Sequence, residues 1–227
     1  MKYKNIVEGK FISRPNRFIA NVEIDGENCV VHVKNTGRCK ELLIPGTIVY
    51  LEKSDNPERK TQYDLIAVLK NGEKLINMDS QVVNSVAEEW LKKGNLFPKG
   101  SIIRREVKYG NSRFDIYVES GNRKAFIEVK GVTLENNGVV RFPDAPTLRG
   151  VKHVNELVKS IKDGYEAYVL FVVQINEVSY FTPNDETHKA FGDALRNAKK
   201  QGVKIIAVNC KVEPDSIEID SEREVVL

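Results

Sequence analysis

The chain has 227 residues, of which 41% are hydrophobic and 30% are charged. This composition is typical of a globular protein with one large or two small domains, and it excludes a disordered or fibrous chain. No apolar run approaches the roughly 18 residues of a membrane helix. The amino-terminal sequence MKYKNIVEGKF lacks the apolar stretch of a signal peptide. We therefore expect a cytoplasmic protein whose three scattered cysteines are reduced thiols.

The net charge is only +3, but the basic residues are distributed unevenly. Residues 1–80 carry 13 Lys and Arg against 11 Asp and Glu, and residues 81–155 carry 13 against 8. Residues 156–227 carry 9 against 13. A local basic surface suits a polyanion such as nucleic acid, whereas ordinary variation among solvated faces explains the same counts. Charge alone therefore leaves both interpretations open.

The first eighty residues predict a small all-β domain. Short β-prone runs occur at residues 17–24, 29–35, 47–53, 63–69 and 74–77, with Gly- or Pro-containing turns between them. Such a series of short strands suggests a barrel of the oligonucleotide/oligosaccharide-binding (OB) type, although an SH3-like barrel would give the same pattern. We place this OB-fold-like β-barrel at residues 1–79.

From residue 79 the hydrophobic period becomes helical. Residues 79–94 predict a helix, because Val82, Val86 and Trp90 share one face and Gly94 ends it. Strands are predicted at 101–109, 112–120 and 123–132, then a helix at 147–164 and a buried strand at 165–175. A helix at 185–201 and a strand at 203–208 follow. The order α-β-β-β-α-β, then α-β, predicts a mixed α/β domain over residues 80–227.

Charged residues interrupt the apolar stretch FIEVK at residues 126–130. A two-residue turn at residues 121–122 would place Asp115 opposite Glu128 on the neighbouring strand. Because side chains alternate between faces, Lys130 would share the face of Glu128, with Arg113 opposite it. One sheet face is therefore expected to present Asp115, Glu128 and Lys130. The other face is expected to be apolar and to carry Ile116, Val118, Ile127 and Val129.

Two carboxylates placed opposite each other repel, and a divalent cation would remove that repulsion. Hard carboxylate ligands suit Mg²⁺ or Mn²⁺. The alternative is a polar sheet face that simply meets solvent. The spacing acid-x-Lys also occurs at Glu8–Lys10, Glu58–Lys60 and Glu106–Lys108, so spacing alone does not decide between them.

An Asp followed by a hairpin partner with Glu-x-Lys, within an α-β-β-β-α-β unit, resembles the PD-(D/E)XK phosphodiesterase superfamily. The resemblance implies a PD-(D/E)XK nuclease-like fold in which Asp115, Glu128 and the Val129 carbonyl ligate Mg²⁺ or Mn²⁺. It also implies that Lys130 orients or helps to deprotonate the attacking water and balances phosphate charge.

Two neighbouring positions bear on this resemblance. Such nucleases often carry an acidic residue on the first helix, which makes Glu89 a further expected metal ligand and Glu88 the alternative. Phe114 precedes Asp115, where the name of the motif has Pro. That position varies within the superfamily, so the departure leaves the resemblance in place.

The stretches KNTGR, SDNPERK, EVKYGNSRFD, FIEVKGVTL and FPDAPTLRGVKH together resemble the sugar fermentation stimulation protein family. They lie between Lys34 and His153, and the remaining layout also fits. The family implies an amino-terminal OB-type barrel, a carboxy-terminal nuclease-like domain, DNA binding and a regulatory link to sugar (maltose) utilisation. The sequence leaves open whether this DNA is single- or double-stranded. It also leaves open whether the protein is a monomer or a homodimer.

Basic residues in both predicted domains are candidates for contacts with nucleic acid. Arg149 and His153 are four residues apart on one helix face and lie near Lys152, although a solvated helix face is the alternative. Asp144 precedes that helix and is a further candidate for the site. The residues expected at the nucleic-acid backbone are Arg38, Lys40, Arg59, Lys60, Arg113, Arg149, Lys152 and His153.

The leading hypothesis is a DNA-binding protein with a Mg²⁺- or Mn²⁺-dependent deoxyribonuclease site. The first alternative is a DNA-binding regulator of sugar metabolism genes whose nuclease fold is catalytically silent. The chain shows no helix-turn-helix pattern, which weakens that alternative. A third possibility is an oligosaccharide-binding module, which leaves Lys130 and the opposed carboxylates unexplained.

Overall fold

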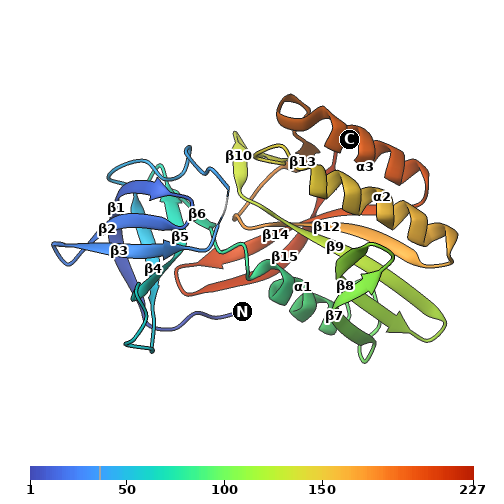
Figure 1. Cartoon of the computed structure of the whole chain (residues 1–227), viewed down its shortest axis with the longest axis horizontal. Coiled ribbons are helices and arrows are strands. Elements are labelled where there is room, and N and C mark those ends of the chain that lie inside the picture. Colours follow the sequence, from blue (N-terminus) through green and yellow to red (C-terminus); the bar gives the residue numbers. More distant parts are fainter. Residues whose placement is uncertain (36) are drawn as a thin grey trace.

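The computed structural model describes residues 1–35 and 37–227. A barrel formed by the first strands lies beside a larger domain in which helices cover both faces of a sheet (Figure 1). No helix among the described residues is long and apolar enough to cross a membrane. The barrel region contains β1 (Ile6–Asn16), β2 (Ile19–Ile24), β3 (Glu27–Val33), β4 (Ile48–Lys53), β5 (Tyr63–Lys70) and β6 (Lys74–Asn77).

The barrel is closed by five strands. β1 pairs with β2 and β4, β2 with β3, and β4 with β5, while β3 runs parallel to β5 and completes the ring. This arrangement confirms the predicted OB-fold-like barrel. The prediction was wrong about its membership, because it omitted β1 and counted residues 74–77, which form β6 and only extend the sheet beside β5.

Gly9 and Pro15 obscured β1, because both residues usually interrupt a strand. In the structure Gly9 allows the strand to pass close to its neighbours. A Cβ atom at this position would lie 2.6 Å from Val22 Cγ1 and 3.0 Å from Leu51 Cδ1. The glycine that suggested a break is therefore required by the packing of the closed barrel.

The second domain contains a nine-stranded sheet in the order β10-β11-β13-β15-β14-β12-β9-β8-β7. The predicted alternation of helices and strands is confirmed, while β10, β11, β13 and β15 were missed. The elements are α1 (Val83–Lys92), β7 (Ile102–Tyr109), β8 (Ser112–Ser120), β9 (Arg123–Val132), β10 (Leu134–Asn136), β11 (Val139–Phe142), α2 (Leu148–Lys162), β12 (Glu166–Val173), β13 (Tyr180–Pro183), α3 (Asp185–Lys200), β14 (Lys204–Glu213) and β15 (Ser216–Val225).

Helix α1 covers one face of this sheet, and α2 and α3 cover the other (Figure 1). Val86 and Trp90 of α1 pack in one core with Ile116 and Ile127 of the sheet. Burying such a side chain contributes on the order of 1.5–3 kcal/mol. Strand β12 lies between β9 and β14 and is parallel to both, which explains its nearly continuous apolar sequence.

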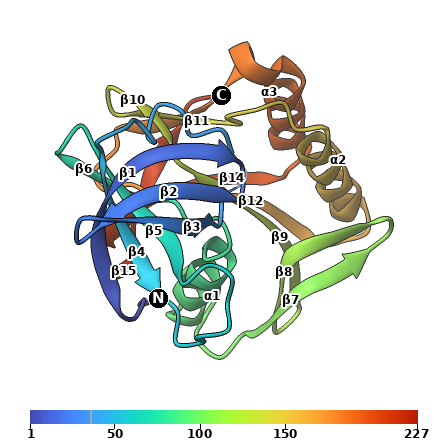
Figure 2. The same cartoon turned by 60° about the vertical axis from the view of Figure 1, so that its left-hand side comes forward.

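The two domains are joined by more than the covalent chain. The hairpin β14–β15 reaches toward the barrel (Figure 1 and Figure 2), and an isolated bridge pairs Lys2 with Ser216. Glu135 of β10 accepts hydrogen bonds from Lys70 (2.7 Å) and Lys74 (3.1 Å) of the barrel region. Burial raises the pKa of Glu135, but the bonds from these lysines and from Gly138 N–H outweigh it and lower the pKa to about 2. The ionised carboxylate therefore stabilises the junction.

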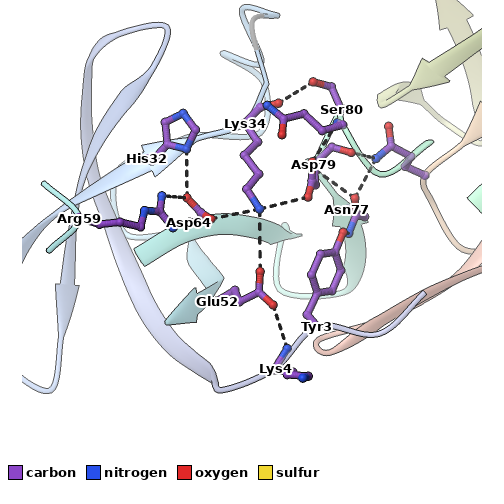
Figure 3. Close-up of polar contacts among 12 residues, drawn as sticks. Tyr3, Lys4, His32, Lys34, Glu52, Arg59, Asp64, Asn77, Asp79 and Ser80 are labelled. Atoms are coloured by element: carbon purple, nitrogen blue, oxygen red, sulfur yellow. Dashed lines mark hydrogen bonds and ion pairs between the residues drawn. The ribbon is translucent and has the colours of Figure 1, made fainter. Parts of the chain in front are cut away.

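A buried charge cluster, the Lys34 network, lies where the barrel meets the second domain (Figure 3). Lys34 Nζ is 3.1 Å from Asp64 Oδ2, 3.6 Å from Asp79 Oδ2 and 3.8 Å from Glu52 Oε2. Asp64 and Asp79 are only 5% and 4% exposed, so their charges depend on such partners. The network fixes the segment after β3 against the segment before α1.

Asp64 is the most fully paired member of this network. Arg59 donates to both of its oxygens, at 3.1 and 2.7 Å, and His32 Nδ1 lies 3.0 Å from Oδ1 (Figure 3). Burial raises the pKa of Asp64, but the bonds from Arg59 and Lys34 outweigh it and lower the pKa to about 2. The carboxylate therefore stays ionised within the barrel.

Candidate metal and catalytic site

The hairpin β8–β9 has the predicted register. Ser120 pairs with Arg123, and the ladder continues in step to Ile116 opposite Ile127. The apolar side chains expected on one face lie together in the core beneath α1. Asp115 and Glu128 follow directly beyond the last pair, where the ladder between the two strands ends. The candidate site is therefore at the open end of this hairpin.

The side chain of Asp115 lies in the open end of the hairpin. The N–H of Val129 donates to Asp115 Oδ2 at 2.8 Å, and Asn84 Nδ2 donates to Oδ1 at 3.1 Å. Burial, together with the nearby charge of Glu128, raises the pKa of Asp115. The position of the carboxylate is therefore fixed by β9 and α1, although its charge is disfavoured there.

Strand β8 loses its regular alternation around Asp115. Phe114 lies in the same core cluster as Tyr117, whereas Ile116 lies in the cluster on the α1 side. Glu106, on the neighbouring strand β7, has a positive φ of 55°. Irregularities of this kind redirect side chains and occur often beside functional sites. Here the irregularity explains why Asp115 turns toward the backbone of β9.

Glu128 is 1% exposed and lies on β9 facing α2. Its Oε1 accepts from Lys130 Nζ at 2.5 Å and is hydrogen-bonded to His153 Nδ1. Burial raises the pKa of Glu128, but the His153 and Lys130 contacts outweigh it and leave the pKa below its usual value. Its Oε2 is buried and has no hydrogen-bond partner among residues 1–35 and 37–227.

An oxygen-ligated cation fits this arrangement. A buried carboxylate oxygen without a partner is costly, and here it lies beside a second carboxylate. Asn84 Oδ1, next to Asp115, is also buried without a partner within the described chain. No group of three or more His, Cys, Asp or Glu side chains gathers around one point in the described residues. Amide or carbonyl oxygens, such as that of Val129, would therefore complete the ligand set.

Helix α1 contributes Asn84 to this site, a residue that the sequence analysis missed. Glu89 was the expected ligand, but it binds the amino-terminal NH₃⁺ of Met1 at 2.7 Å. Glu88 pairs with Lys92 at 2.5 Å. Glu89 lies five residues after Asn84, which rotates it about 140° around the helix. An amide carries no charge signal in the sequence, so only the packing of α1 identifies Asn84.

The basic residues predicted on α2 have different environments. His153 is 6% exposed and contacts Glu128, so it positions this carboxylate. Arg149 is exposed and its Nε lies 3.5 Å from His153 Nε2, while Lys152 donates to the Asn111 carbonyl at 3.0 Å. Contact with phosphate stays a prediction for these three residues.

The remaining basic candidates are spread over the surface. Arg38, Lys40 and Lys60 are exposed in the barrel, and Arg113 is exposed and pairs with Glu106 at 3.3 Å. The guanidinium of Arg59 is bound to Asp64, so its charge is largely neutralised. Within the part of the chain that the structure describes, none of these side chains forms a hydrogen bond or ion pair with Asp115, Glu128 or Lys130.

The fold and the site define a two-domain protein that joins an OB barrel to a mixed α/β domain with a carboxylate pair. Comparison with known proteins agrees. Residues 12–78 match the family described as the SfsA N-terminal OB domain, and residues 81–216 match the sugar fermentation stimulation protein RE domain. The chain belongs to the sugar fermentation stimulation protein family, as the sequence resemblance predicted.

Relatives share the whole length of the chain. It is 63% identical to a sugar fermentation stimulation protein homolog of Clostridium beijerinckii and 59% identical to one of Ruminiclostridium cellulolyticum, in both cases over all of both chains. The solved structure of Pyrococcus furiosus SfsA in complex with Ca²⁺ is 28% identical, with a TM-score of 0.87. The match covers 100% of this chain and 98% of the Pyrococcus furiosus chain.

Proposed function

We propose that the protein is a metal-dependent nuclease that hydrolyses phosphodiester bonds in DNA, with Mg²⁺ or Mn²⁺ held at Asp115 and Glu128. The observation that carries this proposal is the buried Glu128 Oε2, which has no partner among the described residues and lies beside a second carboxylate at the open end of the hairpin. A purely structural polar cluster would pair its buried oxygens. A cation would supply the missing partner.

The Ca²⁺ in the relative from Pyrococcus furiosus supports a divalent cation in this fold. Ca²⁺, Mg²⁺ and Mn²⁺ all prefer oxygen ligands. In this chain Asp115, Glu128, the Asn84 amide and the Val129 carbonyl are the oxygens that fit such an ion. When bound, the ion would polarise a phosphoryl oxygen and lower the pKa of its water ligand.

The side chains of this protein then have separate tasks. Lys130, whose Nζ is 2.5 Å from Glu128 Oε1, would orient the attacking water and balance phosphate charge. His153 holds Oε1 of Glu128, which leaves Oε2 for the ion. The Val129 N–H and Asn84 fix Asp115. DNA is the proposed partner, and the exposed lysines and arginines of the barrel would follow its backbone.

Digestion of labelled single- and double-stranded DNA, and of RNA, in Mg²⁺, Mn²⁺ or EDTA tests the proposal. Asp115→Asn, Glu128→Gln and Lys130→Met should each reduce metal-dependent cleavage by about 10²-fold or more. The control is Glu213→Gln, which changes an exposed carboxylate paired with Lys211 at 2.8 Å and should cleave as wild type does. Glu89→Gln decides whether that residue is a ligand.

Binding of DNA without cleavage in either metal would contradict the nuclease proposal. That outcome would instead support a catalytically silent, DNA-binding regulator. The lack of three converging acidic, His or Cys side chains in the described residues is the observation that favours this second candidate. Unchanged cleavage in all three site variants would place the activity elsewhere or in a contaminant.

A further inference from the structure

A pocket lies beside the hairpin site, where the barrel meets the second domain. Its volume is about 140 Å³, and its lining includes Asn35 from the barrel and Gly131, Arg141, Phe142 and Gln174 from the second domain. Gly131 directly follows Lys130 in β9, so the pocket begins one residue from the candidate catalytic lysine. Because successive residues of a strand face opposite sides, a ligand at Lys130 would reach the pocket past the end of β9.

Gln174 gives one wall a fixed hydrogen-bond acceptor. The side chain is buried, and its Nε2 donates to Asn77 Oδ1 at 2.8 Å and to the Asp79 carbonyl at 2.9 Å. These bonds direct Oε1 toward Gly131, where a Cβ atom would lie only 2.6 Å from it. No described residue donates a hydrogen bond to Oε1. Because Gly131 has no Cβ atom, Oε1 can pack against the backbone of β9 at the wall of the pocket.

Phe142 and Arg141 give the pocket an aromatic surface and a cation. The Phe142 ring is half-buried and is held by Phe171 and Phe191, with ring centroids 5.7 and 5.2 Å away. Arg141 is also half-buried, and it forms no ion pair with any described residue. Rings and guanidinium planes are the groups on which proteins stack unpaired bases.

The Lys34 network makes these walls rigid (Figure 3). Ser80, which lines the pocket, donates from Oγ to the Lys34 carbonyl at 2.5 Å. Asp79, which binds Lys34 Nζ through its side chain, accepts the hydrogen bond from Gln174 through its carbonyl. The pocket is therefore held by both domains before any ligand arrives.

We propose that this pocket binds one unpaired nucleobase of a nucleic acid strand whose phosphate lies at Asp115, Glu128 and Lys130. The inference rests on the proposed nuclease function and specifies its substrate as a strand with at least one base out of the stack. A base offers a face to Phe142 and Arg141, and its N–H groups meet Gln174 Oε1. A base stacked within a duplex would have to leave the helix to enter.

Binding of two labelled single strands of equal length tests this inference. One carries normal bases, and the other carries the same phosphates with an abasic residue at every position. Wild-type protein, in EDTA and again in Ca²⁺ with strand integrity checked, should bind the normal strand about tenfold more tightly, since stacking contributes that order of affinity per base. The ratio of the two affinities is the readout.

Phe142→Leu removes the aromatic surface and should reduce the ratio toward one. Because Phe142 packs against two other rings, Arg141→Gln serves as a second variant, at a side chain that has no ion pair with the described residues. It should reduce the ratio as well. The control is Lys200→Gln, which removes one positive charge at the far end of α3 and should leave the ratio unchanged. Thermal unfolding confirms that each variant is folded.

Three results would overturn the inference: equal affinities of wild type for both strands, no binding of either strand, or an unchanged ratio in both folded variants. The cleavage assay separates this failure from failure of the nuclease proposal. If wild-type protein cleaves DNA but binds the normal and the abasic strand with nearly equal affinity, the base-binding pocket is rejected and the nuclease proposal stands. If wild-type protein binds the normal strand tenfold more tightly, both variants lose this preference and no metal supports cleavage, the base-binding pocket stands and the nuclease proposal is rejected.

Discussion

The two buried charge clusters of this protein differ in how completely their carboxylates are paired. In the Lys34 network, each oxygen of Asp64 has two hydrogen-bond or ion-pair partners, drawn from Lys34, Arg59 and His32. In the hairpin site, Oε1 of Glu128 has two partners and Oε2 has none within the described chain. A buried cluster that completes itself holds the fold together, whereas an incomplete one is suited to bind a ligand.

The pKa values of the two aspartates show the same difference. Burial raises the pKa in both places, but hydrogen-bonded cations lower that of Asp64 to about 2. At Asp115 burial and the charge of Glu128 act together, so the pKa stays raised. The negative charge of Asp64 is therefore stabilised by the protein's own cations, whereas that of Asp115 is left to be balanced.

The largest expected effect on stability is that of Lys34→Met. The substitution leaves Asp64 and Asp79 without their shared ammonium, and breaking a buried ion pair in this way costs about 3–5 kcal/mol. Urea unfolding followed by circular dichroism measures the loss. The matched control is Lys93→Met, which breaks an exposed pair with Glu218 and should cost at most about 1 kcal/mol. Similar losses in both variants would show that the Lys34 network is not a stabilising core.

The next effect is stabilisation by a divalent cation. An ion that binds only the folded state at 100 times its dissociation constant should raise the free energy of unfolding by about 2.7 kcal/mol. Thermal unfolding in Mg²⁺, Mn²⁺ or Ca²⁺ should show this rise in wild type and in Glu213→Gln. Glu128→Gln should lose it. An equal rise in Glu128→Gln would place the ion outside the hairpin site.

Part of the fold and of the hairpin site could be predicted from the sequence. The hairpin register followed from the turn at residues 121–122 as far as Ile116 opposite Ile127, whereas the predicted pair of Asp115 with Glu128 lies just beyond the end of the ladder. The order of helices and strands in the second domain followed from hydrophobic periodicity. Both are local patterns, which sequence alone specifies well.

Other parts depended on contacts between distant segments. The role of Asn84 arises from the packing of α1 against β8, and the contact of His153 with Glu128 arises from the packing of α2 against β9. Strands β10, β11 and β13 have only three or four residues each, too few for a periodic signal. The pairing of Lys34 with Asp79 spans the junction of the domains, which no local pattern predicts.

A pH dependence distinguishes the paired cluster. Because the pKa of Asp64 is about 2 in the folded protein and 3.8 ordinarily, its ionisation contributes stability that is present above about pH 4 and is lost as the pH falls toward 2. The shift corresponds to about 2 kcal/mol. Wild type should therefore be more stable than Asp64→Asn above pH 4, with a difference that shrinks on acidification. A difference independent of pH would mean that Asp64 is not ionised in the fold.

The smallest expected effect on stability is that of Asp115→Asn, and it gives the sharpest contrast between the two clusters. An Asp→Asn substitution should lower the free energy of unfolding at Asp64 but not at Asp115. Asp115→Asn removes a half-buried negative charge beside Glu128, while its amide oxygen still accepts from Val129 N–H. Asn84 Nδ2 donates to the other Asp115 oxygen, so the Asn84 amide must flip for its Oδ1 to accept from the new amide nitrogen. Without metal at pH 7, the variant should be as stable as wild type or up to about 1 kcal/mol more stable. Urea unfolding in EDTA measures this against Asp64→Asn, which should be destabilised. A comparable loss in both variants would make Asp115 a structural residue like Asp64, and the hairpin site would then lose its distinction from the Lys34 network.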